Sequence, residues 1–226
     1  MKTKVDDDPC FAFVWHKTNR KNITMDNNKR LLLEQRRQQL QVEIKAETYI
    51  ERYITPVQEI FDYLRQQEVT YQIAGIVYVP AEYLLYVEQA ITKTPYDTYG
   101  FQSTHLQKPY LEQLIDTMFN RFPSTNPLRY VPDLPEYANY NGVRPENGFR
   151  DGLQQVMQAL GLQDQQAYIY YLNYGVVLQL PLAALSNHEH EELFNGWHGE
   201  VLIFPIELEW LIVFTLEEEW LGGTGE

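Results

Sequence analysis

Two short apolar runs near the end of the chain form its strongest pattern of hydrophobic and polar positions. Residues 201–204 and 210–215 are rich in β-branched and aromatic side chains, and Pro205 and a short acidic stretch separate them. Runs of this length and composition that are bounded by a breaker predict β-strands. Because nearly every position is apolar, both faces of each strand should be covered. We therefore expect two neighbouring central strands of one sheet, joined by a short connection.

Helical periodicity dominates the earlier part of the chain. Leu33, Leu40 and Ile44 are spaced by seven and four residues, which places them on one face of a helix over residues 27–51. Thr55 and Pro56 are typical of the first turn of another helix. The same patterns predict helices over 55–67, 80–94, 106–122 and 148–160, and strands over 73–79, 167–173 and 176–180.

Composition divides the chain into four parts. Residues 1–24 show no persistent period and predict a poorly ordered or appended N-terminus, whereas residues 25–122 are mainly helical. Residues 123–147 are rich in Pro and Tyr, which favours a long loop or a linker. Residues 148–226 form an acidic α+β part that ends in a frayed glycine-rich tail over 222–225. We expect one compact α+β domain, with N-terminal helices packed against a mixed or antiparallel sheet.

The negative charge of the chain is concentrated in its last third. The formal net charge is −13, and residues 151–226 contain twelve acidic residues but no Lys or Arg. Such a surface repels nucleic acid and anionic membranes, and it attracts cationic partners. No apolar run reaches the ~18 residues that span a bilayer, and the single cysteine, Cys10, rules out a disulfide within the chain. We expect a cytoplasmic protein that binds neither nucleic acid nor membranes.

The acidic segment predicts a docking surface for a basic protein, because complementary charge speeds the encounter of two proteins. Tryptophans beside carboxylates are typical anchors of an interface. An acidic surface that only keeps the protein soluble is the alternative interpretation. The predicted partner-binding residues are Glu189, Glu191, Glu192, Trp197, Glu207, Glu209, Glu217, Glu218, Glu219 and Trp220.

A histidine cluster offers the main alternative function. His188 and His190 are candidate metal ligands together with Glu192, and they would serve a metal-assisted hydrolase. The two histidines are closer in sequence than the pair in a zinc-peptidase motif. A solvated helix or loop face is the competing interpretation of the same residues.

Motifs of common enzyme classes are absent from the sequence. It contains no phosphate-binding glycine loop that leads into a helix, and no Gly-x-Ser-x-Gly motif. We therefore predict no catalytic residue and no cofactor, and we favour a non-enzymatic protein. A structural or regulatory subunit that assembles through the helix over 27–51 is a further alternative.

The end of the chain resembles that of small uncharacterised bacterial proteins. The resemblance covers residues 204–222, with Phe204-Pro205, the run from Glu209 to Thr215, the three glutamates 217–219 and Gly222. Some of those proteins are similar to immunity proteins of polymorphic or contact-dependent toxin systems. The resemblance implies an α+β immunity-type protein that binds and blocks a cognate toxin, often a basic nuclease. These families share no catalytic motif, so the resemblance assigns no site residue.

Overall fold

The computed structural model describes residues 27–93, 100–132, 134, 149–187, 191–194 and 198–225. The chain divides into two compact units, residues 1–38 and 39–226. The described residues of the first unit are helical. The expectation for residues 1–24, and that for most of 123–147, fall outside the described part of the chain.

Helices and strands alternate irregularly along the described residues. The α-helices are α1 (Asn27–Tyr49), α2 (Val57–Gln66), α3 (Leu84–Lys93), α4 (Pro109–Arg121), α5 (Phe149–Ala159) and α6 (Leu182–Ser186). A π-helical turn spans Ile50–Ile54, and 3-10 turns span Ala81–Tyr83, Ser103–His105 and Glu191–Leu193. The strands are β1 (Gln72–Ile76), β2 (Gln166–Tyr171), β3 (Val176–Pro181), β4 (Val201–Phe204), β5 (Trp210–Phe214) and β6 (Trp220–Thr224).

All six of these strands join one sheet in the order β1-β3-β2-β4-β5-β6. Each neighbouring pair is antiparallel. The predicted pair of strands near the end of the chain is confirmed as β4 and β5, which are adjacent interior strands with Ile203 opposite Ile212. The α+β class is also confirmed, and β1, from the mainly helical part, pairs with β3 at one edge.

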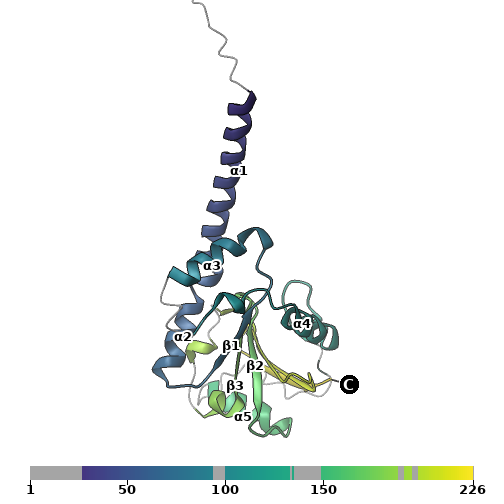
Figure 1. The fold of residues 1–226 in the computed structure, drawn as a ribbon. Helices are drawn as coiled ribbons and strands as arrows, with labels where there is room; N and C mark the ends of the chain where they lie inside the picture. Colours follow the sequence, from purple (N-terminus) through teal and green to yellow (C-terminus); the bar gives the residue numbers. More distant parts are fainter. Residues whose placement is uncertain are drawn as a thin grey trace, which may run out of the picture. The chain divides into compact units, whose positions relative to one another are not determined.

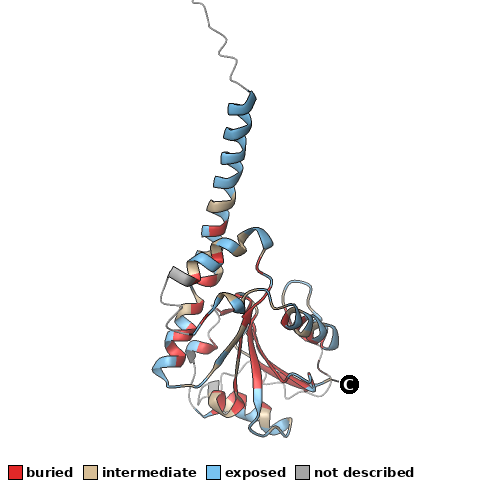
Figure 2. Cartoon of the chain, in the orientation of Figure 1, coloured by how far each residue is buried: buried red, intermediate tan, exposed pale blue. Residues whose placement is uncertain are grey.

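Helices cover both faces of the sheet, which explains the continuous apolar runs. Along β4, Val201 and Ile203 point to one face, and Leu202 and Phe204 point to the other. The first face packs against α2, α5 and α6, and the second packs against α4 and the segment that follows it (Figure 1). The central strands are therefore buried along nearly their whole length (Figure 2).

The glycine-rich end of the chain is a strand, so the prediction of a frayed tail over 222–225 is wrong. β6 pairs with β5 along its whole length and forms one edge of the sheet. Its glycines are required by close packing. A Cβ on Gly222 would overlap the side chain of Val156 in α5, and a Cβ on Gly223 would lie 2.9 Å from the Cβ of Leu134.

Candidate functional site

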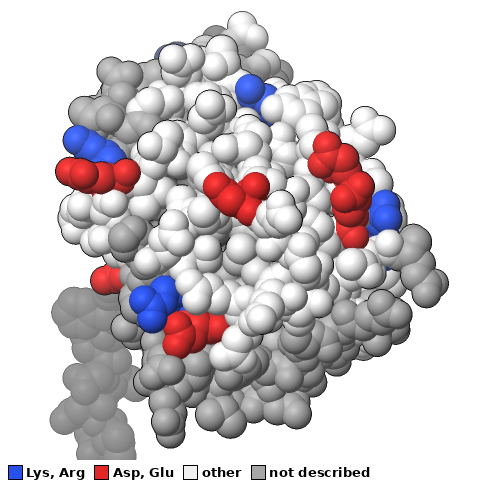
Figure 3. All heavy atoms as spheres, turned by 90° about the horizontal axis from the view of Figure 1, so that it is seen from below, with Lys and Arg blue, Asp and Glu red and all other residues white. Residues whose placement is uncertain are grey.

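The predicted carboxylates do not form one surface, because they occupy turns at opposite ends of β5. Glu207 and Glu209 lie in the β4–β5 connection, whereas Glu217, Glu218 and Glu219 lie in the β5–β6 connection. The five residues of β5 separate the two turns by roughly 14 Å at the rise of an antiparallel strand. On the face in Figure 3, acidic groups stand apart among uncharged atoms, and basic groups lie beside several of them. Each turn therefore has to be considered as a separate site.

The remaining predicted residues lie in different surroundings. Glu192 is exposed on the 3-10 turn Glu191–Leu193. Trp220 is only 1% exposed, and its ring packs 4.9 Å from the rings of Phe194 and Phe214. It therefore contributes to the core and offers no surface to a partner. The expectations for His188, Glu189, His190, Trp197 and the side chain of Glu191 lie outside the described residues.

The β5–β6 turn holds its glutamates on a rigid frame. The backbone N–H of Thr215 donates to the carbonyl of Glu219 at 2.9 Å, and the N–H of Glu218 donates to the carbonyl of Thr215 at 2.9 Å. The Thr215 hydroxyl accepts the N–H of Glu219 at 3.2 Å. Glu218 has a left-handed backbone with φ of 62°, which completes the tight reversal. The backbone that carries these three glutamates is thus held by hydrogen bonds.

A second turn, between α4 and Pro132, packs beside the first. The Ser124 hydroxyl accepts the N–H groups of Asn126 at 3.2 Å and Val131 at 3.0 Å. The side-chain oxygen of Asn126 accepts the N–H of Leu128 at 2.8 Å. These bonds fold the loop into a compact turn that carries Arg129 outward.

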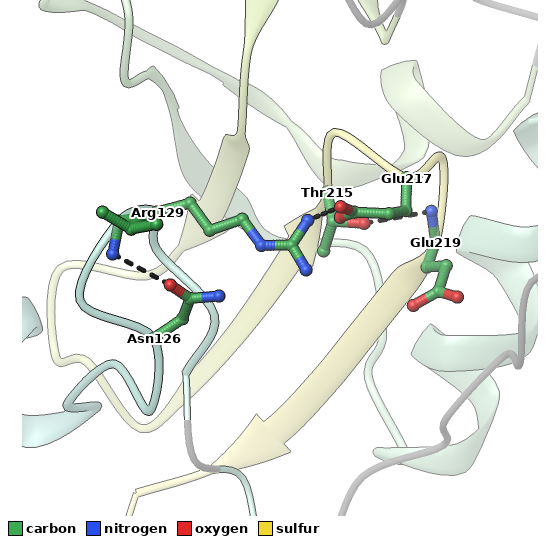
Figure 4. A network of polar contacts seen from close by, with 6 residues as sticks. Asn126, Arg129, Thr215, Glu217 and Glu219 are labelled. Atoms are coloured by element: carbon green, nitrogen blue, oxygen red, sulfur yellow. Dashed lines mark hydrogen bonds and ion pairs between the residues drawn. The ribbon is translucent and has the colours of Figure 1, made fainter.

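The two turns meet through an ion pair between the Arg129 guanidinium and the Glu217 carboxylate (Figure 4). A second arginine, Arg121 at the end of α4, contacts the residue that follows β6. Its Nη2 donates to the carbonyl of Gly225 at 3.0 Å. An exposed ion pair of this kind contributes about 0.2–1 kcal/mol at most. The pair marks the place where the two turns meet.

Apolar side chains flank this ion pair. Leu128 is 93% exposed and Leu216 is 42% exposed, and each directly precedes one member of the pair. We call the set of residues 128, 129 and 216–219 the two-turn surface. It combines two exposed leucines with three carboxylates and one guanidinium, so negative charge is in excess. Exposed apolar groups rimmed by charge are typical of protein-binding surfaces.

His198, which the sequence analysis did not assign a role, is buried and joins the 3-10 turn Glu191–Leu193 to Tyr174. His198 Nε2 lies 2.7 Å from the carbonyl of Glu192, and Nδ1 lies 3.2 Å from the hydroxyl of Tyr174. A carbonyl can only accept, so Nε2 carries the proton and Nδ1 accepts from the tyrosine. Burial lowers the pKa of His198. With both nitrogens engaged, the ring holds the Glu191–Leu193 turn in place and is not a free base.

Tyr78 forms a second polar cluster that the sequence did not reveal. Its backbone is left-handed, with φ of 58°. Its N–H donates to Glu112 Oε1 at 3.0 Å, and its hydroxyl donates to Asp116 Oδ1 at 2.7 Å. Burial and the bond to Asp116 raise the pKa of Tyr78 far above its usual range. The cluster fixes α4 to the end of β1, so these two carboxylates have a structural role.

The described residues contain no group of three or more His, Cys, Asp or Glu side chains placed to hold a metal ion. The histidines of the hydrolase hypothesis lie outside that part of the chain. Within it, no helix is both long and apolar enough to cross a membrane.

Comparison with known proteins identifies no relative. No protein-family model, no curated protein and no solved structure matches the chain.

Proposed function

We propose that the chain is a non-enzymatic binding protein that docks a basic partner protein through the two-turn surface. The observation that carries the proposal is the exposure of Leu128, at 93%, beside Leu216 and the carboxylates of a rigid turn. A leucine this exposed buries nothing in the free protein. Its transfer from water into an interface would contribute about 1.5–3 kcal/mol. The hydrogen bonds of Ser124 and Asn126 hold the turn in place, so little ordering entropy is lost on docking.

Charge supports a basic partner. Residues 151–226 contain no Lys or Arg, so within this surface only Arg129, from the preceding segment, opposes the glutamates. A field of one sign steers an oppositely charged protein and fixes its orientation. A partner arginine that approaches Glu217 or Glu219 can form a bidentate pair with the carboxylate.

The resemblance at the end of the chain suggests the class of this partner. An immunity-type protein blocks a toxin domain, and a toxin that acts on nucleic acid needs a cationic surface. An acidic surface that covers those cations would exclude the substrate by competition. The proposed activity is therefore inhibition of a basic protein such as a toxin domain.

Paired charge variants test the proposal, because β5 separates two matched acidic turns. The double variant Glu217→Gln/Glu219→Gln removes two charges from the two-turn surface, and Glu207→Gln/Glu209→Gln removes two charges from the opposite turn. Each variant and the wild type are immobilised and used to capture partners from a bacterial lysate at low and high salt. Leu128→Asp tests the apolar contribution in the same assay.

The expected partner is basic, and its capture rate falls as salt rises. Retention should be lost with Leu128→Asp, reduced with Glu217→Gln/Glu219→Gln, and unchanged with Glu207→Gln/Glu209→Gln. The proposal is wrong if no specific partner is captured, if the partner is acidic, or if the two charge variants behave alike.

A further inference from the structure

Helix α1 carries apolar side chains on two opposite faces. It is one continuous helix from Asn27 to Tyr49, so residues three and four apart lie on the same face. Val42, Ala46 and Tyr49 share the face that packs on the rest of the chain. Ala46 is fully buried, and the ring of Tyr49 lies 5.5 Å from that of Tyr83. This face accounts for one apolar stripe of the helix and leaves the other to be explained.

Leu33, Leu40 and Ile44 form the second stripe. They are 59%, 42% and 61% exposed, and at 3.6 residues per turn they lie about 180° around the helix from the buried face. Alternating steps of three and four residues extend the stripe to Arg30, Arg37 and Glu47. This is the spacing of the inner positions of a two-stranded coiled coil. We call the set of residues 30, 33, 37, 40, 44 and 47 the α1 seam.

The first part of α1 is helical although every residue over 27–41 is exposed. In proteins most of the stability of a helix comes from the packing of one face, and a short helix alone in water is only marginally stable. This part of α1 therefore gains little from the described part of the chain. Packing of the α1 seam against another helix would stabilise it.

The charge of α1 changes sign along its length. Of the charged residues over 27–38, all but Glu34 are basic, and of those over 39–49, all but Lys45 are acidic. Two copies of such a helix that run in the same direction place like charges side by side. Two copies that run in opposite directions place the basic half of each on the acidic half of the other, which is favourable.

We infer that two copies of the chain pair through the α1 seam as an antiparallel two-helix coiled coil. From its first position to its last the seam reads Arg-Leu-Arg-Leu-Ile-Glu. When one copy is reversed, Leu33 lies opposite Ile44 of the second copy, and Arg30 lies opposite Glu47 of the second copy. Two-fold symmetry repeats each pair.

The same register explains the remaining polar position of the seam. Arg37 lies opposite Leu40 of the second copy, where its aliphatic stem can cover the leucine while the guanidinium stays in water. A parallel pair would instead bring each of Arg30 and Arg37 against its own equivalent. Polar residues at inner positions set the direction and register of a coiled coil at a cost in stability, so the dimer should form reversibly. The α1 seam and the two-turn surface lie on different elements, so either proposal can fail alone.

Sedimentation equilibrium of the full chain measures the pairing. The concentration series runs from about 1 μM to about 1 mM, which covers the affinity of a small interface. Leu40→Asp places a carboxylate in the centre of the seam. Gln38→Asp introduces the same residue at an exposed position of the same helix outside the seam, and is the matched control. Far-UV circular dichroism checks that each variant keeps the fold.

The wild type should be a reversible dimer at the upper end of this range. Leu40→Asp should weaken the association at least about thirtyfold, because the substitution is present twice in each dimer. Gln38→Asp should change it by less than about threefold, as expected of a position outside the interface.

Charge exchange tests the direction of the two helices. Arg30→Glu and Glu47→Arg should each weaken the dimer about threefold to tenfold, because each brings like charges together. The double variant Arg30→Glu/Glu47→Arg should return the affinity to within about twofold of wild type. In a parallel pair each of these positions meets only its own equivalent, so the double variant would recover nothing.

Three results would overturn the inference. A wild type that stays monomeric throughout the series, or equal association of Leu40→Asp and Gln38→Asp, would show that the α1 seam is not an interface. Failure of the double exchange to restore the affinity would exclude the antiparallel pair. If Leu40→Asp does not keep its fold, the charge exchange still decides, because it changes only exposed residues.

Discussion

Replacing Gly222 with alanine tests the packing of β6 against α5. The added methyl group would overlap Val156 and lie 3.2 Å from a Leu160 methyl. In a helix a valine side chain is confined to essentially one rotamer, so Val156 cannot turn aside. Overpacking of this kind costs about 1–3 kcal/mol, and the reduced entropy of the unfolded chain returns about 0.4–1 kcal/mol. We expect Gly222→Ala to lower the free energy of unfolding by about 1–2 kcal/mol.

Urea unfolding and thermal melting measure this effect. For a chain of this length, a loss of about 1–2 kcal/mol corresponds to a fall in Tm of about 2–8 °C. Thr224→Ala, an exposed change in the same strand, is the control and should stay within about 0.5 kcal/mol of wild type.

A double-mutant cycle with Val156→Ala identifies the contact responsible. Val156→Ala alone should cost about 2 kcal/mol because it leaves a cavity. Combined with Gly222→Ala, it makes room for the new methyl, so the double variant should be at least about 1 kcal/mol more stable than the two separate effects imply. If Gly222→Ala is neutral or stabilising, or if the two effects are additive, the explanation for the glycines of β6 is refuted.

Three further predictions concern the polar clusters. Burial lowers the pKa of His198, so the unfolded chain takes up the proton first, and the free energy of unfolding should fall as pH drops below about 6.5. Because burial also lowers the pKa of His105, the variants His198→Gln and His105→Gln are compared by urea unfolding at about pH 7.5 and 5.5. If His198→Gln leaves the dependence of the unfolding free energy on pH unchanged, the assignment to His198 is contradicted. A double-mutant cycle on Arg129 and Glu217 should give a coupling of about 0.2–1 kcal/mol that disappears in high salt, and a coupling that persists in salt would contradict a solvent-exposed pair. Tyr78→Phe removes the donor to Asp116 and should cost about 1 kcal/mol in chemical denaturation, whereas unchanged stability would show that the bond contributes nothing.

The strands that the sequence predicted best are those with an unambiguous local pattern. β4 and β5 are continuous β-branched and aromatic runs bounded by a proline and acidic turns, and helices on both sides of the sheet account for that composition. β6 was missed because Gly222 and Gly223 are typical of a loop when only local propensity is considered. Glycine is needed at these two positions because Val156 and Leu134, which lie far away in sequence, pack closely against them.

The candidate site was predicted only in part, for a related reason. Composition located the carboxylates near the end of the chain, but their distribution depends on the direction of each strand. Glu207 precedes β5 and Glu217 follows it, so the length of this one strand carries the two carboxylates to opposite ends of the sheet. The hydrogen bond between His198 and Tyr174 joins residues 24 apart, and no spacing pattern in the sequence predicts it.

The position of β6 at the rim of the sheet has a consequence for shortened forms of the chain. β5 contains five apolar residues and no charge, and β6 shields one of its two hydrogen-bonding sides. A polypeptide that stops before Trp220 would leave that side bare and would uncover the ring of Phe214. Apolar strands with unpaired backbone N–H and C=O groups pair with the same strand of other molecules and form intermolecular β-ladders. Such a fragment should aggregate during expression, and proteolytic loss of the last few residues should have the same result.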